Sequence, residues 1–311
     1  MLVLILDGKT GLEGAGEGIR LCLFSVIPAL FPFLILSMVL THGLTGAHIP
    51  VLRPLGRLVG IPKGAESLLA VGLLGGYPVG AQSVAQLYQQ GQISVKDAKR
   101  MLGFCSNAGP AFLFGIVGTQ LSHPVDAWKL WIIHILSAIL VGMILPGRTR
   151  EPIPCTQSKP PSLTKTLTDG VHIMAQICGW VVLFRVLISF LRKWVLWLLP
   201  TDLQILVIGL LELTNGCLTL SEISSQGLQL VLASVMLSFG GLCVMMQTLS
   251  VTNTLGFGMY LKGKLLQTAF SVLLSVLAAA SGMFPLTVLA LTAIVCREAK
   301  NIGRNFKPIG V

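Results

Sequence analysis

The sequence feature that most constrains the fold is a pair of apolar segments, each interrupted near its middle by helix-breaking residues. The first segment, residues 65–91, is broken by GGYP at 75–78, and the second, residues 101–120, by SNAGP at 106–110. The arms around the first break are about ten residues long, which at about 1.5 Å per residue covers half of a hydrocarbon core about 30 Å thick. Arms of this length predict a re-entrant hairpin rather than a complete membrane span.

Helix breaks inside a membrane have a restricted set of explanations. Backbone polar groups cannot go unpaired in lipid, so non-helical backbone survives there only where protein buries it or where it lines a wet cavity. In secondary transporters such breaks mark substrate or ion sites. Two neighbouring breaks that both carry polar side chains therefore favour a binding site, and the alternative is a pair of Pro/Gly kinks without a ligand.

Composition agrees with a membrane protein. The 311 residues are 53% hydrophobic and 11% charged, with a mean hydropathy of +0.82, which is atypical of a soluble domain. The net charge of +10 is spread over short clusters between apolar runs. No arginine-rich arm or DNA-binding helix pattern accompanies it, so these clusters indicate cytoplasmic loops rather than nucleic-acid binding. The seven cysteines have no CxxC spacing and are interpreted as small packing residues.

Local signals predict where helices begin. Residues 9–20 are expected to form an interfacial helix or loop before a first span at 21–42, and Ser94 with Asp97 predicts a helix that starts near Val95. Pro110 suits the first position of a helix that restarts after the second break, with Ser106 or Asn107 as its cap.

The chain divides into two halves with the same order of parts. Each half contains a span, an interrupted hairpin, a broken span and a further span, and the second half has its breaks at 212–216 and 238–241. Because each half crosses the membrane three times, the halves are inverted relative to each other. We therefore predict an all-α polytopic membrane protein of two inverted repeats, each with a re-entrant helical hairpin and a broken transmembrane helix. The expected parts are an N-terminal repeat 1–146, a cytoplasmic linker 147–166, a C-terminal repeat with a final span 167–296, and a cytoplasmic tail 297–311.

Basic residues predict the orientation. With about seven crossings and two hairpins, most loops that contain Lys or Arg fall on one side, which the positive-inside rule makes cytoplasmic, and the N-terminus falls outside. The opposite loops, 123–126 and 200–202, contain none. The basic positions on the cytoplasmic side are Arg53, Arg57, Lys63, Lys96, Lys99, Arg100, Arg148, Arg150, Lys159, Lys165, Lys262, Lys264, Arg297, Lys300, Arg304 and Lys307.

Glu212 is the outstanding candidate for a functional residue, because an intramembrane carboxylate commonly marks an ion or proton site. The alternative is that its segment lies shallow and Glu212 faces water. Arg185 is a second charge in an apolar run, which either pairs with a carboxylate such as Glu212 or extends to the interface, the latter being favoured. The predicted solute-binding residues are Tyr77, Gln82, Ser106, Asn107, Glu212, Thr214, Asn215, Ser238 and Gln247.

An enzyme is not expected. The sequence has no HExxH metal helix, GxSxG elbow, Walker loop or pair of intramembrane aspartates. No catalytic residue, metal site or cofactor is predicted, and H⁺ or Na⁺ is the only candidate coupling ion. The competing interpretation is a membrane scaffold that does not transport, in which the breaks pack only against one another or against partner proteins.

Four sequence motifs, the first of which has two parts, resemble those of a known family. GGYPVGAQ, LYQQGQIS, FCSNAGPAFLFGIVG, ELTNG and FGGLCVMMQ are similar to those of YlbJ-type sporulation integral membrane proteins, which are grouped with the nucleoside-recognition or Gate domain proteins. The resemblance extends from about residue 18 to 280, although family members usually have a further N-terminal span where this chain has only residues 1–6. It implies a bacterial inner-membrane protein of endospore formation with a transporter-like fold. The implied partners are the lipid bilayer, a small polar solute that the name of the domain describes as a nucleoside, a second copy of the chain, or other sporulation membrane proteins.

Overall fold

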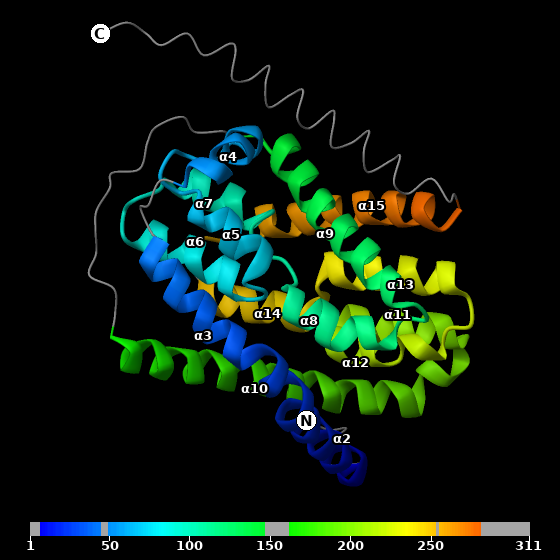
Figure 1. Ribbon diagram of the computed structural model, residues 1–311. Helices are drawn as coiled ribbons and strands as arrows, with labels where there is room; N and C mark the ends of the chain where they lie inside the picture. Colours follow the sequence, from blue (N-terminus) through cyan, green and yellow to red (C-terminus); the bar gives the residue numbers. More distant parts are fainter. Residues whose placement is uncertain (1–6, 45–48, 147–161, 253–254, 281–311) are drawn as a thin grey trace, which may run out of the picture.

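A computed structural model of the protein describes residues 7–44, 49–146, 162–252 and 255–280, and in these residues the secondary structure is helical (Figure 1). The first half contains α2 (Gly8–Leu21), a π-helical stretch η1 (Cys22–Val26), α3 (Ile27–Leu44), η2 (Pro50–Leu52), α4 (Arg53–Val59), α5 (Ser67–Leu74), α6 (Val79–Gln89), α7 (Val95–Leu102), α8 (Pro110–Phe112), η3 (Leu113–Val117), η4 (Gly118–Gln120) and α9 (Pro124–Ile144). The second half contains α10 (Leu163–Trp194), η5 (Leu196–Leu198), α11 (Thr201–Leu211), α12 (Leu213–Leu218), η6 (Leu220–Glu222), α13 (Gln226–Phe239), α14 (Gly241–Thr252) and α15 (Gly258–Ala280).

Five stretches of the described chain are long and apolar enough to cross a membrane: Gly8–Val39, Pro124–Ile144, Leu163–Trp194, Gln226–Thr252 and Gly258–Ala280. The expected separation of residues 9–20 from the first span is wrong, because one continuous helical stretch begins at Gly8 after the Asp7 cap. The linker also ends earlier than predicted, since α10 begins at Leu163. The final span predicted before residue 296 lies outside the described residues.

The structure confirms the helix breaks. The first separates α5 from α6, the second separates α7 from α8, and the fourth is the pair Gly240–Gly241, both of which have positive φ angles. The third is narrower than predicted, because only Glu212 separates α11 from α12. Ser94 caps α7 and Pro110 begins α8 as predicted, but the cap of α8 is Gly109, with no side chain involved.

Glycines let the two helices of each hairpin approach closely. In the first hairpin, a Cβ on Gly80 would lie 3.1 Å from the Gly72 Cα and 1.9 Å from the carbonyl oxygen of Cys105. In the second hairpin, a Cβ on Gly216 would lie 2.2 Å from the Gly209 Cα. Both hairpins therefore cross where neither helix has a side chain.

The two halves contact each other through several pairs of helices. α6 of the first hairpin packs on α14, and α12 of the second hairpin packs on η3, so each hairpin contacts the far part of the other half's broken helix. In the same way α7 packs on α15, and α9 packs on α13. In Figure 1 the hairpin α5–α6 lies towards the end of the molecule that holds α4, and α11–α12 lies towards the opposite end.

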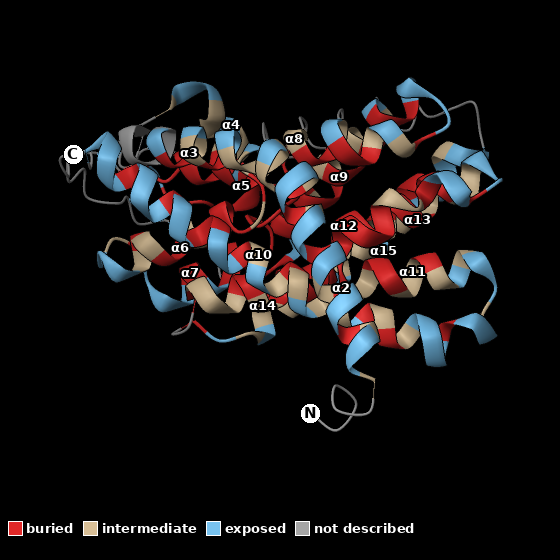
Figure 2. Ribbon diagram, turned by 90° about the horizontal axis from the view of Figure 1, so that it is seen from below, coloured by how far each residue is buried: buried red, intermediate tan, exposed pale blue. Residues whose placement is uncertain are grey.

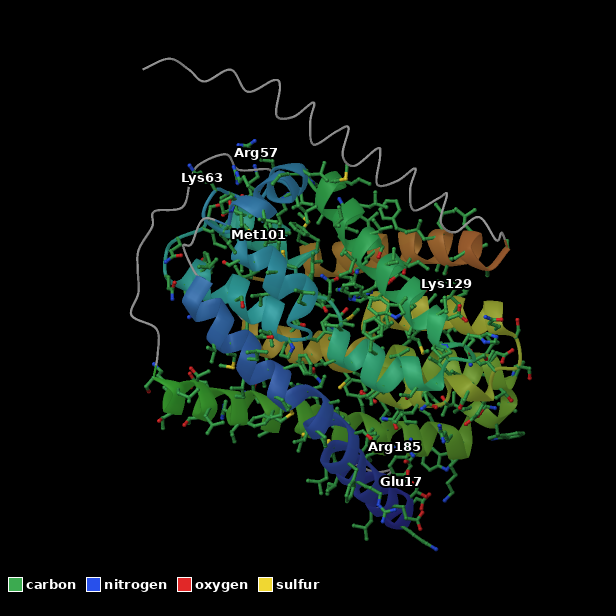
Figure 3. The ribbon with its side chains drawn as sticks, viewed as in Figure 1. Glu17, Arg57, Lys63, Met101, Lys129 and Arg185 are labelled. Carbon is green, nitrogen blue, oxygen red and sulfur yellow. The ribbon has the colours of Figure 1, made fainter. Side chains whose placement is uncertain are left out.

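Buried residues are concentrated along the middle of the molecule, where the breaks lie (Figure 2). Arg100 is one of them, which corrects its assignment to a cytoplasmic loop: it is 1% exposed. Its guanidinium donates to carbonyl oxygens near the C-terminal ends of α4 and α9, those of Val59, Gly60, Gly142 and Leu145. Arg57 and Lys63 remain at one end of the molecule, far from Glu17 and Arg185 (Figure 3).

The glycine crossings give the first prediction. Gly80→Ala is expected to destabilise the protein by ~1–3 kcal/mol, because the added methyl group would overlap the Cys105 carbonyl and force the hairpin apart. Thermal unfolding in detergent measures the loss. The control is Gly179→Ala in α10, where a Cβ would meet nothing within 4 Å. Equal stability of the two variants would contradict the crossing.

Candidate functional site

The four helix breaks meet at the centre of the molecule. A Cβ on Gly109, in the second break, would lie 3.0 Å from the Cα of Gly76 in the first. A Cβ on Gly240, in the fourth break, would lie 3.3 Å from the Tyr77 hydroxyl oxygen. One on Gly241 would lie 3.4 Å from the backbone nitrogen of Leu213, beside the third break. Segments far apart in the sequence thus bring their non-helical backbone to one place.

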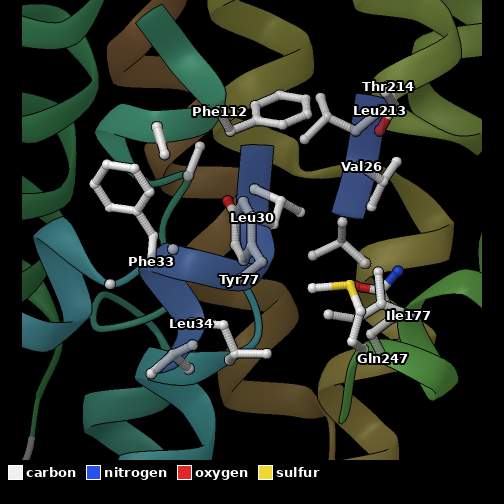
Figure 4. Close-up of a pocket in the computed structure, with 18 of the residues that line it drawn as sticks. Val26, Leu30, Phe33, Leu34, Tyr77, Phe112, Ile177, Leu213, Thr214 and Gln247 are labelled. Carbon is white, nitrogen blue, oxygen red and sulfur yellow. The ribbon is translucent and has the colours of Figure 1, made fainter. Parts of the chain in front are cut away.

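A cavity lies beside the converging breaks (Figure 4). Its walls come from the first, second and third breaks, from α14, from α3 with the end of η1, and from α10. The empty space around the cavity, including the part open to the outside, is about 680 Å³, and the cavity itself has a volume of only about 50 Å³. This is room for a few waters, so the cavity is narrow in this conformation.

Glu212 places a carboxylate at the cavity wall. The side chain is 2% exposed and caps α12, with Oε1 accepting from the Thr214 backbone N–H at 3.1 Å and Oε2 from that of Asn215 at 2.7 Å. The side-chain amide of Asn215 also donates to Oε2, at 2.6 Å. In the described part of the chain no Lys or Arg forms an ion pair with this carboxylate. The positive end of α12 therefore stabilises it.

Arg185 is connected to Glu212 indirectly. Its Nη1 donates to Asn215 Oδ1 at 2.9 Å, and its guanidinium forms an ion pair with Glu17. Asn215 therefore stands between the arginine and the buried carboxylate. Of the two alternatives for Arg185, the structure shows the less favoured one, a pair with a carboxylate, and the partner is Glu17 on α2 rather than Glu212 (Figure 3).

Lys264 is the functional candidate that sequence reasoning missed. It was assigned to a cytoplasmic loop, but it lies within α15 and is 0% exposed. Its ammonium donates to the Tyr77 hydroxyl at 2.9 Å, to Gln267 Oε1 at 2.9 Å and to the carbonyl oxygen of Ser106. The Tyr77 hydroxyl in turn donates to the Leu237 carbonyl at 3.1 Å. The available signal was Gln267, one turn after Lys264 in an apolar helix, which indicates a buried polar pair.

Asn107 joins the second break to the first hairpin. Its Nδ2 donates to the carbonyl oxygens of Gly72 and Phe104 at 2.9 and 2.8 Å, and its Oδ1 accepts from Gln267 at 2.8 Å. Nearby, the backbone N–H of Ala108 donates to His134 Nε2 at 3.1 Å. These bonds satisfy polar groups that the break leaves without helical partners.

The predicted site residues therefore have different places. Tyr77, Glu212, Thr214 and Gln247 line the central cavity. Asn215 lies behind Glu212, whereas Ser106, Asn107 and Ser238 are buried in the packing around the breaks. Gln82 lies on a second cavity, described next. Within the residues that the structure describes, no group of three His, Cys, Asp or Glu side chains is arranged to hold a metal ion.

The second cavity is polar and has an empty volume of about 1330 Å³, including its open side. Glutamines of α6 face polar residues of α10 across it, and α3 and α14 contribute to its walls. Each of these four helices lines both cavities. On α3, Met38 of the second cavity lies one turn after Leu34 of the central cavity, and on α14, Ser250 of the second cavity lies one turn after Gln247 of the central cavity. We call this cavity the vestibule; its polar residues are Gln82, Gln86, Gln89, Gln90, Lys165, Asp169, His172, Gln176 and Ser250.

Comparison with known proteins identifies a relative. The chain is 28% identical over 293 residues to the sporulation integral membrane protein YlbJ of Bacillus subtilis (strain 168), in an alignment that covers 79% of this chain and 71% of YlbJ. The chain is a homologue of that protein. It is accordingly a multi-pass integral membrane protein related to a sporulation protein of bacteria. No family model and no solved structure matches the chain.

The geometry at Glu212 gives a second prediction. Glu212→Gln is expected to lower the free energy of unfolding by ~1–3 kcal/mol. The two oxygens of the carboxylate accept hydrogen bonds from N–H groups, and the substitution replaces one of these oxygens by an NH₂ group, which is itself a donor. Chemical or thermal unfolding measures the change. Glu222→Gln, on an exposed side chain, is the control and is expected to stay within about 0.5 kcal/mol of the unsubstituted protein. A Glu212→Gln variant as stable as the control would mean that the carboxylate faces water.

Proposed function

We propose that this chain is a transporter-like protein that moves a small polar solute across the bacterial cytoplasmic membrane by alternating access. The observation that carries the proposal is the convergence of four helix breaks beside a cavity with a buried carboxylate. Broken helices around a central site are the usual construction of secondary transporters. The name of the homologue supports a role in sporulation.

Matched contacts between the two halves support an inverted repeat, which is the architecture that alternating access uses. The matched contacts of α6 with α14 and of η3 with α12 are those expected if the two halves are related by a twofold axis in the membrane plane. The two glycine crossings are equivalent under the same relation. Each hairpin is then re-entrant, entering and leaving on one side. We assign the face with Arg57 and Lys63 to the cytoplasm under the positive-inside rule (Figure 3).

The cavity wall suggests the chemistry of the solute. Most of the lining is apolar, and Thr214, Gln247 and Glu212 supply a few polar groups, which is the usual composition of a small-molecule site. The N-terminal end of α6 also lies at its wall, and helix N-termini favour carbonyl or anionic groups. A solute with both an apolar face and hydrogen-bonding groups fits this wall. A nucleoside-like molecule is one such solute, and H⁺ or Na⁺ at Glu212 would couple its movement.

The vestibule supports access from the basic face. It lies along the same four helices as the central cavity and is open, whereas the central cavity is narrow. A solute that enters the vestibule would reach the central site once the residues between them, such as Met38 and Leu34, move apart. Movement of the two halves against each other would close this route and open the opposite one.

A membrane scaffold for spore envelope formation is the second candidate. Asn107 and Lys264 favour it, because their hydrogen bonds hold the breaks together with protein alone. The central cavity favours the transporter, since a scaffold has no use for a void beside Glu212.

A solute screen tests the proposal. Purified protein is heated with nucleosides, nucleobases, amino acids, dipicolinate and Na⁺ at two pH values. One solute class is expected to raise the Tm, because binding to the folded state alone stabilises it. Thr214→Val and Gln247→Leu are expected to remove the shift, and Thr168→Val, on an exposed face of α10, to keep it. A shift that survives both cavity substitutions would place the solute elsewhere, and normal spore formation by both cavity variants would support the scaffold.

Accessibility of the vestibule provides a further prediction. In a background without native cysteines, Gln86→Cys is expected to react with a membrane-impermeant maleimide in inside-out vesicles and not in intact cells, because the vestibule opens to the basic face. Thr214→Cys, on the narrow cavity, is the comparison and is expected to react at least about tenfold more slowly, as a buried thiol does. Labelling of Gln86→Cys only from outside would reverse the assigned orientation.

A further inference from the structure

Lys264 is a buried cation without a carboxylate partner among the described residues. It lies in the apolar helix α15, it is 0% exposed, and none of the described ion pairs includes it. A charge in such a place is costly unless its surroundings compensate for it. The groups around the ammonium must therefore stabilise its positive charge in place of a carboxylate.

Three oxygen atoms surround the ammonium: the Tyr77 hydroxyl, Gln267 Oε1 and the carbonyl oxygen of Ser106. The carbonyl belongs to the unwound backbone after α7. The ring of Tyr77 adds a cation–π contact, with its centroid 4.9 Å from Nζ, and that of Tyr260 lies at 5.9 Å. Neutral oxygens and aromatic faces, rather than a negative charge, therefore surround Lys264.

Helix ends strengthen this arrangement. Ser106 follows the C-terminal end of α7, and Leu237, whose carbonyl accepts from Tyr77, lies in the last turn of α13. The C-terminal ends of helices carry a partial negative charge that favours cations. In broken-helix transporters, unwound carbonyls and such helix ends coordinate the transported or coupling cation.

We propose that the Lys264 ammonium is the resident occupant of a monovalent-cation site formed by Ser106, Tyr77 and Gln267. The chain supplies its own cation at the point where the first, second and fourth breaks meet. Removing the side chain beyond Cβ leaves an oxygen-lined site for a small monovalent cation such as ethylammonium or Na⁺. This inference does not depend on transport, because it concerns what occupies the site and not what crosses the membrane.

An alternative role for Lys264 is hydrogen bonding alone. A neutral donor would then be enough to hold Tyr77 and Ser106, and Lys264→Gln would keep the stability of the unsubstituted protein. A cation site requires the charge. The Gln variant is then expected to be destabilised like Lys264→Ala, and only Lys264→Ala, which leaves the space open, is expected to respond to added cations.

Cation rescue tests the proposal. The unsubstituted protein, Lys264→Ala, Lys264→Gln and Lys262→Ala are heated in choline chloride, NaCl and ethylammonium chloride at equal ionic strength and pH. Lys262 is the matched control, because it lies two residues earlier on α15 and is exposed. In choline, which is too large for the site, the two Lys264 variants are expected to unfold at least about 5 °C lower than the unsubstituted protein. For Lys264→Ala, ethylammonium or Na⁺ is expected to restore at least half of this loss.

The unsubstituted protein and Lys262→Ala are each expected to have the same Tm in all three salts. A Lys264→Gln variant as stable as the unsubstituted protein, or a Lys264→Ala variant that no cation restores, would overturn the proposal. If Lys264→Ala does not fold, ¹⁵N-lysine spectra of the unsubstituted protein decide. A protected ammonium signal that shifts in Tyr77→Phe would support the resident cation, and its absence would reject it. A failed solute screen leaves this result unaffected.

Discussion

The requirement that no backbone polar group be left unpaired in lipid governs this structure. Each helix break exposes carbonyl and N–H groups that a continuous helix would have paired. At the first two breaks Asn107 binds the Gly72 and Phe104 carbonyls, and His134 accepts from the Ala108 N–H. At the third, Glu212 accepts from two backbone N–H groups. The breaks therefore converge because each needs polar partners that only other protein segments can provide.

The same requirement separates charge within the molecule. The Glu212 carboxyl group lies at the N-terminal end of α12, and the Lys264 amino group lies beside the C-terminal ends of α7 and α13. Helix dipoles favour both placements, so neither charge needs the other as a direct partner. The N-terminal end of α12 and the C-terminal ends of α7 and α13 thus give the protein one place that favours negative charge and one that favours positive charge. A protein of continuous helices would offer neither at this depth.

The local features of the fold could be predicted from the sequence, and its long-range partners could not. Gly, Pro and capping residues act on their own neighbours, so the breaks and the Ser94 cap were predictable. Tyr77, which binds Lys264, and Glu17, which binds Arg185, each lie more than 150 positions away in the sequence from the residue that they bind. A lysine near the start of an apolar run has the same local sequence whether it lies in a loop or faces a helix break. For this reason Tyr77 was expected at the site, but the ammonium that holds it was not.

The most direct test of the account is a cryo-electron microscopy structure of the protein in lipid nanodiscs, with a bound antibody fragment to aid alignment. The account predicts that the four breaks lie together near the middle of the bilayer. The Lys264 ammonium is expected between Tyr77, Ser106 and Gln267, and Glu212 beside an enclosed cavity. Breaks that lie at the membrane surface, or a Lys264 side chain that extends into water, would contradict the central claim.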